Sequence, residues 1–192
     1  PNEDANLLAD WRFNGGEGDI LFDHSGNSNH GQINGATWSN DVPQGPYYGP
    51  EWYVSNDGSD ENNGSYDYPF ASVQRAIDAA NDYDLVEIFS GEYFENIVIN
   101  KNLNIGGNNE NGDVIINGNQ TGSVITIQNI SDSMSVGLYG LRIFNGRSEK
   151  GGGIFANNTW LEMDQCRVLN NQTAGQGSQG AGIYSINSSV VM

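Results

Sequence analysis

A repeat with a nearly fixed period is the feature of this sequence that most constrains its fold. Four matching segments begin with an isoleucine, at Ile97, Ile125, Ile154 and Ile183, and the steps between them are 28, 29 and 29 residues. A period of roughly 20 to 50 residues is the signature of architectures that stack one small unit on the next. The sequence therefore predicts that each segment pairs with its counterpart in the following repeat.

Two further sets of short apolar segments recur with the isoleucines. The second set is Leu103–Ile105, Val136–Leu138, Leu161–Met163 and Val190–Met192, and the third is Val114–Asn117, Arg142–Asn145 and Arg167–Asn170. Three strands in a turn of about 25 residues indicate a parallel β-helix, in which alternate side chains point into a shared interior. We expect this all-β fold from about Val86 to Met192, with the four isoleucines inside and Asn117, Asn145 and Asn170 stacked at a turn. An antiparallel sandwich is the alternative, which the regular steps disfavour.

One segment before the repeats has the pattern of an amphipathic α-helix. Its apolar residues follow helical spacing and lie on one face: Phe70, Val73, Ala76, Ile77 and Ala80. The first coil of a β-helix exposes an apolar end and unpaired strand edges, which a capping element must cover. We therefore expect a helix over residues 72–80 that caps the first coil.

The residues around this helix form a motif that also occurs in a known superfamily. Tyr53-Val54-Ser55-x-Asp57-Gly58-Ser59-Asp60 precedes the helix, and Val86-x-Ile88-x-x-Gly91-x-Tyr93-x-Glu95 follows it. With them, residues 52–192 resemble the N-terminal part of pectin-lyase-like proteins. The resemblance implies a right-handed, single-stranded parallel β-helix with three strands per coil. It does not imply one activity, because that superfamily includes lyases, hydrolases, epimerases, adhesins and phage tail proteins.

A different motif lies nearer the N-terminus. Trp11-x-Phe13 is followed by Asp23-x-Ser25-Gly26-Asn27-x-Asn29-x-Gly31 and then by Gly35-Ala36-x-Trp38. These residues resemble the opening of laminin-G/concanavalin-like lectin modules, of which residues 1–42 would hold only the first strands. We expect a short antiparallel β segment there, then a proline-containing linker over residues 43–51, then the β-helix from residue 52.

Charge excludes some classes of partner. The chain has 24 acidic and 7 basic residues and a net charge of −17, so nucleic acid is not expected as a partner. An anionic membrane surface is disfavoured for the same reason, and no apolar run is long enough to span a bilayer. Cys166 is the only cysteine, so no intrachain disulfide can form. The surface composition and the resemblances favour a secreted or cell-surface protein.

The strand set that begins with the isoleucines has four outward positions that bear on chemistry. They are Val98, Thr126, Phe155 and Tyr184, and none is ionisable, so we expect no catalytic residue on this face. Phe155 and Tyr184 are candidates for stacking against sugar rings, and a packing pair between coils is the alternative. The recurring Arg142 and Arg167 are read either as surface arginines or as the base of a lyase.

An acidic loop before the helix is a candidate calcium site. Asp57, Asp60 and Asn62 bring oxygen atoms close together in sequence, and calcium takes six to eight such ligands. A plain solvated turn is the alternative reading. Calcium is the only cofactor that the sequence suggests.

Two classes of function follow. The first is an extracellular or cell-surface protein that associates with a polysaccharide or a cell-surface glycan, or is adhesive, and is itself noncatalytic. The second is the N-terminal part of a polysaccharide lyase or glycoside hydrolase whose catalytic coils lie beyond Met192. Since the last repeat stops within a coil, we expect the native protein to continue, with any targeting signal upstream of Pro1.

Overall fold

The computed structural model describes residues 7–11, 17–38, 45–108, 112–128 and 134–192. Contacts divide the chain into two compact units, Pro1–Gln44 and Gly45–Met192. The chain is mostly β, with 44% of residues in strands and 4% in helix. The expectation of an all-β protein is therefore confirmed.

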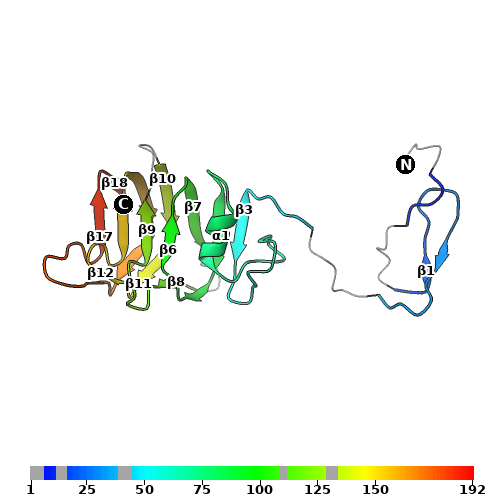
Figure 1. Ribbon diagram of the computed structural model, residues 1–192, viewed down its shortest axis with the longest axis horizontal. Helices are drawn as coiled ribbons and strands as arrows, with labels where there is room; N and C mark the ends of the chain where they lie inside the picture. The colour runs from blue at the N-terminus through cyan, green and yellow to red at the C-terminus, as the bar shows by residue number, and fades with distance from the viewer. Residues whose placement is uncertain (1–6, 12–16, 39–44, 109–111, 129–133) are drawn as a thin grey trace. The chain divides into compact units, whose positions relative to one another are not determined.

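The second unit is a β-solenoid of about three turns, and Figure 1 shows its strands stacked one behind another. The largest sheet has the order β18 (Ser189–Val191), β14 (Thr159–Asp164), β10 (Met134–Tyr139), β7 (Leu103–Asn108), β4 (Leu85–Phe89) and β3 (Glu51–Val54). A second sheet has the order β17 (Ile183–Ile186), β13 (Ile154–Asn157), β9 (Ile125–Gln128) and β6 (Ile97–Ile99).

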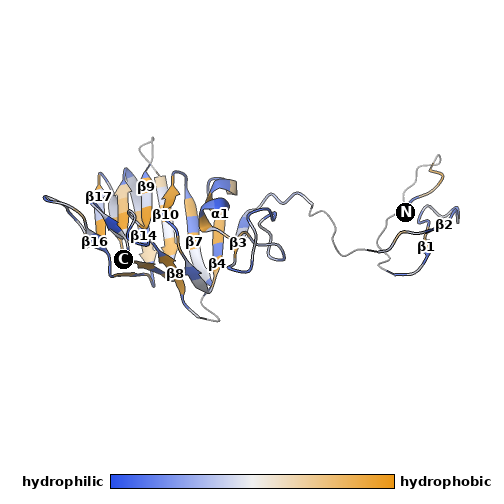
Figure 2. Ribbon diagram, turned by 60° about the horizontal axis from the view of Figure 1, so that its bottom comes forward, coloured by the Kyte–Doolittle hydropathy of each residue, from blue (hydrophilic) through white to orange (hydrophobic). Residues whose placement is uncertain are grey.

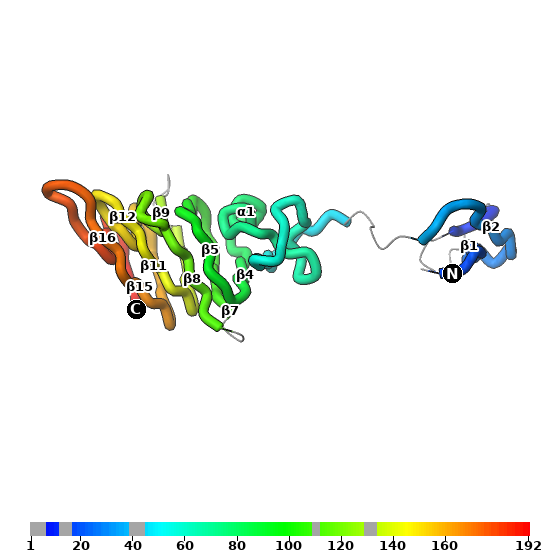
Figure 3. Tube along the Cα trace, turned by 90° about the horizontal axis from the view of Figure 1, so that it is seen from below, coloured from blue at the N-terminus to red at the C-terminus, as the bar shows by residue number. Residues whose placement is uncertain are grey.

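A third sheet has the order β15 (Arg167–Leu169), β11 (Leu141–Phe144), β8 (Val114–Asn117) and β5 (Gly91–Tyr93). Figure 3 shows these four strands following one another along the solenoid. A short pair joins β12 (Arg147–Ser148) to β16 (Gln172–Thr173). All pairs between named strands of this unit are parallel, so the antiparallel sandwich is wrong.

The repeating isoleucines form one ladder in the interior. Ile97 pairs with Ile125, Ile125 with Ile154 and Ile154 with Ile183. The first three are fully buried, and Ile183 is partly buried against the same core. Full burial of such a side chain contributes about 1.5–3 kcal/mol. The hydrophobic colouring in Figure 2 follows the strands, while the loops are largely hydrophilic. The predicted period therefore corresponds to a continuous core.

The expected ladder of asparagines departs from the strand register by one residue at Asn117, whereas Asn145 and Asn170 both follow the paired residues Phe144 and Leu169. Asn117 pairs across the sheet with Phe144 instead of Asn145, because the inward apolar residues set the register. Nδ2 of Asn145 still donates to Oδ1 of Asn117 at 3.1 Å. Asn145 and Asn170 have φ angles of 59° and 53°, the left-handed conformation that asparagine tolerates at turns. The side chains of Asn117 and Asn145 therefore lie one above the other as expected, but their backbone positions are not equivalent in the strand register.

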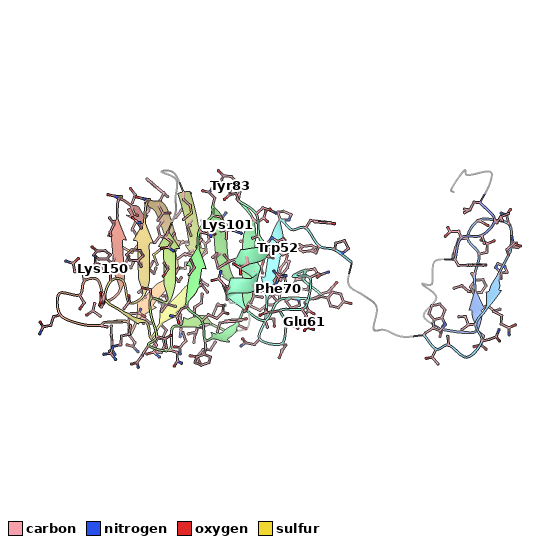
Figure 4. The ribbon with its side chains drawn as sticks, viewed as in Figure 1. Trp52, Glu61, Phe70, Tyr83, Lys101 and Lys150 are labelled. Carbon is pink, nitrogen blue, oxygen red and sulfur yellow. The ribbon has the colours of Figure 1, made fainter. Side chains whose placement is uncertain are left out.

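The predicted helix is present at the first coil. Helix α1 (Val73–Ala79) begins after Ser72, whose Oγ accepts the N–H of Arg75. The helix contacts β3, β4 and β6 and buries its apolar face. Beside it, the rings of Trp52 and Phe70 stack at 6.1 Å, and Figure 4 shows these two side chains near α1. A Cβ on Gly64 would lie 2.3 Å from the Phe70 ring, so glycine is required there.

Polar side chains connect α1 to the neighbouring strands. The amide of Gln74 accepts the N–H of Val98 at 2.8 Å and donates to the Val98 carbonyl at 3.2 Å. It thus makes the hydrogen bonds of a missing neighbour strand along β6. At the helix N-terminus the carboxylate of Glu95 accepts the N–H groups of Val73 and Gln74. At its C-terminus Nζ of Lys101 donates to three backbone carbonyls, where a cation is favoured.

The first unit is organised around one carboxylate. β1 (Ile20–Leu21) and β2 (Gly31–Gln32) pair antiparallel, as expected. The carboxylate of Asp23 accepts the backbone N–H groups of Asp10, Ser25 and Asn29 and the hydroxyl of Ser25. These bonds, above all the one from the Asp10 N–H, hold the pKa of Asp23 well below its ordinary value. The motif from Asp23 to Gly31 therefore encodes a loop closed around an aspartate.

Of the expected linker over residues 43–51, the part from Gly45 lies within the described residues and belongs to the second unit. The carbonyl of Gly45 accepts Nδ2 of Asn63. The ring of Tyr47 packs edge-on against Trp52 at 5.3 Å, and Leu85 donates its N–H to the carbonyl of Pro50. These contacts connect the described part of the linker to the solenoid.

Candidate functional site

Two aromatic rings lie on the outward face of the sheet that contains β13 and β17. Phe155 and Tyr184 are partners in the register between these strands. Their ring centroids are 6.1 Å apart and their planes differ by 13°. Both are partly exposed, because alternation directs Ile154 and Ala156 into the core. The structure thus brings the two predicted residues together, with one face of each ring against the other.

A cation adjoins this aromatic pair. Nζ of Lys150 lies 5.3 Å from the centroid of the Tyr184 ring, a contact that the ring quadrupole favours. Figure 4 shows Lys150 at the end of the solenoid away from Trp52 and Phe70. Residues 134–192 contain four of the seven basic residues, and three of the 24 acidic ones: Arg142, Arg147, Lys150, Arg167, Glu149, Glu162 and Asp164. Electrostatic repulsion of an acidic ligand is therefore weakest in these coils.

The outward positions predicted to lack ionisable groups are where the sequence placed them. Val98 pairs with Thr126 and Thr126 with Phe155. Each lies between buried residues of its strand. None of these four side chains is a carboxylate, an amine or an imidazole, and the absence of a catalytic residue on this face stays a prediction.

The two arginines lie on a different sheet, beside a groove of about 430 Å³. Arg142 and Arg167 are register partners on β11 and β15. Nη2 of Arg142 contacts the carboxylate of Asp113 at 2.7 Å, whereas its buried Nε has no hydrogen-bond partner among the described residues. Cys166 lines the groove, but its thiol donates to the carbonyl of Leu138 and burial raises its pKa. The cysteine is therefore a packing residue and not a ready nucleophile.

The residues of the proposed calcium loop have structural partners. Asp60 accepts the N–H groups of Ala71 and Ser72 and the hydroxyl of Ser72, at 2.8–3.0 Å. Nδ2 of Asn62 donates to the carbonyl of Pro69 at 2.8 Å, and Asp57 is exposed. Within the described residues no group of three or more His, Cys, Asp or Glu side chains is placed to hold a metal ion. The geometry gives Asp60 and Asn62 a role in fastening the loop to the start of α1, and calcium binding stays a prediction.

A third aromatic feature was missed in the sequence. Trp160 on β14 is 53% exposed and borders a groove of about 430 Å³. It is an outward position between the buried Thr159 and Leu161. The alternation that identified Phe155 also applies to β14, so the same reasoning would have singled out this tryptophan.

Together, fold and surface define a parallel β-solenoid that carries exposed aromatic residues on two of its sheets. Comparison with protein-family models, with curated proteins and with solved structures finds no match for this chain. The resemblances to pectin-lyase-like proteins and to a lectin module therefore remain proposals. In the part of the chain that the structure describes, no helix has the length and apolar character needed to cross a membrane.

Proposed function

We propose that this protein is a secreted or cell-surface β-helix that associates with a polysaccharide or cell-surface glycan and is noncatalytic in these coils. The observation that carries the proposal is the outward pair of Phe155 and Tyr184, with rings stacked at 6.1 Å on a rigid sheet. Ring faces and edges of this kind provide the apolar surface on which the C–H groups of a sugar ring can pack. Because strands hold both rings in place, little side-chain entropy is lost on binding.

The proposal includes the finer architecture of a pectin-lyase-like β-helix. In the repeat from Ile154, strands β13, β14 and β15 belong to the three different large sheets, which supports three strands per coil. We propose a right-handed coil because crossover connections between parallel strands are right-handed in nearly all proteins. The Asp23 loop supports a lectin-like first unit in the same protein.

The second candidate is the N-terminal part of a polysaccharide lyase or glycoside hydrolase with catalytic coils beyond Met192. The observation in its favour is the groove beside Arg142 and Arg167, since paired guanidinium groups suit the carboxylates of acidic sugars. The ion pair between Arg142 and Asp113 argues against a free base at that position.

Affinity electrophoresis tests the first proposal. The chain is run through gels that contain xylan, β-glucan, polygalacturonate or alginate, beside the variant Phe155→Ala/Tyr184→Ala. The matched control is Tyr48→Ala/Phe94→Ala, which removes one Tyr and one Phe that are 79% and 66% exposed. We expect retardation of the wild type and of the control in at least one gel, with at least a tenfold weaker interaction for the double variant. Equal retardation of all three, or of none, contradicts the proposal.

A further inference from the structure

The groove beside Trp160 has an opening that the strand register explains. In the largest sheet, the register partners of Trp160 are Ser135 on β10 and Ser189 on β18. A neighbour in a sheet normally covers the side of an aromatic ring, but serine is too small to do so. The indole is therefore flanked on both sides by space, and this space is the groove of about 430 Å³.

The groove is also lined by polar side chains whose hydrogen-bonding groups are free within the part of the chain that the structure describes. Besides Ser135 and Ser189, its lining includes Asn158 and Asn187, which have φ angles of 52° and 49° at the corner that precedes β14 and β18. Within the described residues, no hydrogen bond is made by the side chains of these two asparagines or two serines. Two amides and two hydroxyls beside an exposed indole match the hydroxyl groups and the apolar face of a sugar ring.

The acidic residues near the groove favour neutral sugars over acidic ones. Trp160 shares the outward face of β14 with Glu162 and Asp164, both exposed, and none of the described residues that line the groove is basic. Carboxylates on this face repel an acidic sugar. The Phe155 and Tyr184 pair differs in this respect, because Lys150 lies over it.

We propose that the groove formed by Trp160, Asn158, Asn187, Ser135 and Ser189 is a second glycan-binding site, specific for neutral sugar rings. This proposal shares only its class of ligand, a glycan, with the proposed function, and in that respect it rests on it. The residues of the groove lie on a different sheet from Phe155 and Tyr184.

The test follows the indole N–H signal of Trp160 in the NMR spectrum of the ¹⁵N-labelled full chain. The chain has four tryptophans, and Trp160→Phe assigns the signal by its loss. The probes are cellotetraose, xylotetraose, mannotetraose and chitotetraose as neutral sugars, and tetragalacturonate as the acidic one. We expect a saturable shift with at least one neutral probe, and an affinity at least tenfold lower for tetragalacturonate.

Variants separate this site from the aromatic pair. Ser135→Leu fills one side of the groove and keeps Trp160, and it should abolish the shift, with folding checked by its melting temperature. In Phe155→Ala/Tyr184→Ala the shift of Trp160 should be unchanged, whether or not retardation in the polysaccharide gels is lost. Absence of a shift with every neutral probe, or equal affinity for tetragalacturonate, overturns the proposal. An unchanged shift in folded Ser135→Leu overturns it as well.

Discussion

Asp23 and Asp60 show how single carboxylates close loops in this protein. Each accepts backbone N–H groups and a serine hydroxyl from a nearby segment. Such loops leave several N–H groups without strand partners, and unpaired buried groups destabilise a fold. In sequence Asp60 is a candidate metal ligand, and in the structure both carboxylates are acceptors for backbone donors.

The first prediction concerns Asp23→Asn. Its hydrogen bonds keep the folded pKa below the ordinary value of about 3.8, so the stability that ionisation contributes is present above this pH. It is lost as the pH falls further, through the folded pKa. We expect Asp23→Asn to lower the melting temperature of the first unit at pH 7 and to have a smaller effect at pH 2.5. The indole signals of Trp11 and Trp38, which donate within this unit, report its melting. An equal difference at both pH values contradicts this account.

The second prediction separates the structural role of Asp60 from calcium binding. Asp60→Asn weakens its hydrogen bonds to Ala71 and Ser72, and we expect a loss of about 1 kcal/mol in the free energy of unfolding without calcium. If the loop also binds calcium, an affinity of roughly 10⁻⁴–10⁻³ M is expected for such a module. Calcium should then raise the melting temperature of the wild type and not that of Asp57→Asn/Asp60→Asn at the same ionic strength. Equal thermal shifts in both proteins exclude the calcium site.

At the scale of elements, a side chain of α1 makes the hydrogen bonds at the edge strand β6, where its sheet ends. The amide of Gln74 supplies one donor and one acceptor to Val98, as a neighbouring strand would. Without this residue, β6 presents an unpaired edge beside the helix. Edges of this kind are templates for pairing with other chains, so the helix protects the end of the solenoid as well as its core.

The third prediction concerns this contact. We expect Gln74→Ala to lower the free energy of unfolding by about 1 kcal/mol and to speed hydrogen exchange at the Val98 amide. Gln74→Glu should retain a slower exchange than Gln74→Ala, because a carboxylate still accepts this N–H. The exposed Gln176 offers the control Gln176→Ala, for which no change is expected. Protection of Val98 that survives Gln74→Ala would show that the amide does not replace a strand.

Alternation and period were sufficient to predict the main strands but not the short ones. The inward isoleucines identified the ladder from Ile97 to Ile183, because burial imposes a period of two within a strand. β5 was missed because Gly91 reads as a turn, and its strand character comes from pairing with β8. β12 and β16 were not predicted, since their residues are polar and they form strands through their mutual pairing.

The candidate sites also differ in how far the sequence of a single strand predicts them. The outward positions of Phe155 and Tyr184 follow from local alternation, and so does that of Trp160. The groove beside Trp160 does not, because it exists only where Ser135 and Ser189 become its neighbours. Register between coils therefore determines the groove of the proposed site, and this register cannot be read from one strand alone.

At the scale of the molecule, the proposed noncatalytic role of these coils can be tested directly. The outward positions Val98, Thr126, Phe155 and Tyr184 carry no carboxylate, amine or imidazole, and Arg142 is paired with Asp113. The fourth prediction is that the purified chain releases no unsaturated oligosaccharides from polygalacturonate or alginate in the presence of calcium. Ultraviolet absorbance of the unsaturated ends measures the reaction, with an active lyase as the positive control. A steady rise in absorbance that scales with protein concentration contradicts a noncatalytic role.

The most direct test of glycan association on a β-helix is a crystal structure of the chain with the oligosaccharide that binds it best in the gels. We predict a right-handed coil with three strands per turn, with Ile97, Ile125, Ile154 and Ile183 in one inward ladder. We further predict a sugar ring in contact with Phe155 or Tyr184. A left-handed coil or a coil with two strands contradicts the proposed architecture, and a ligand bound away from both aromatic rings contradicts the proposed function.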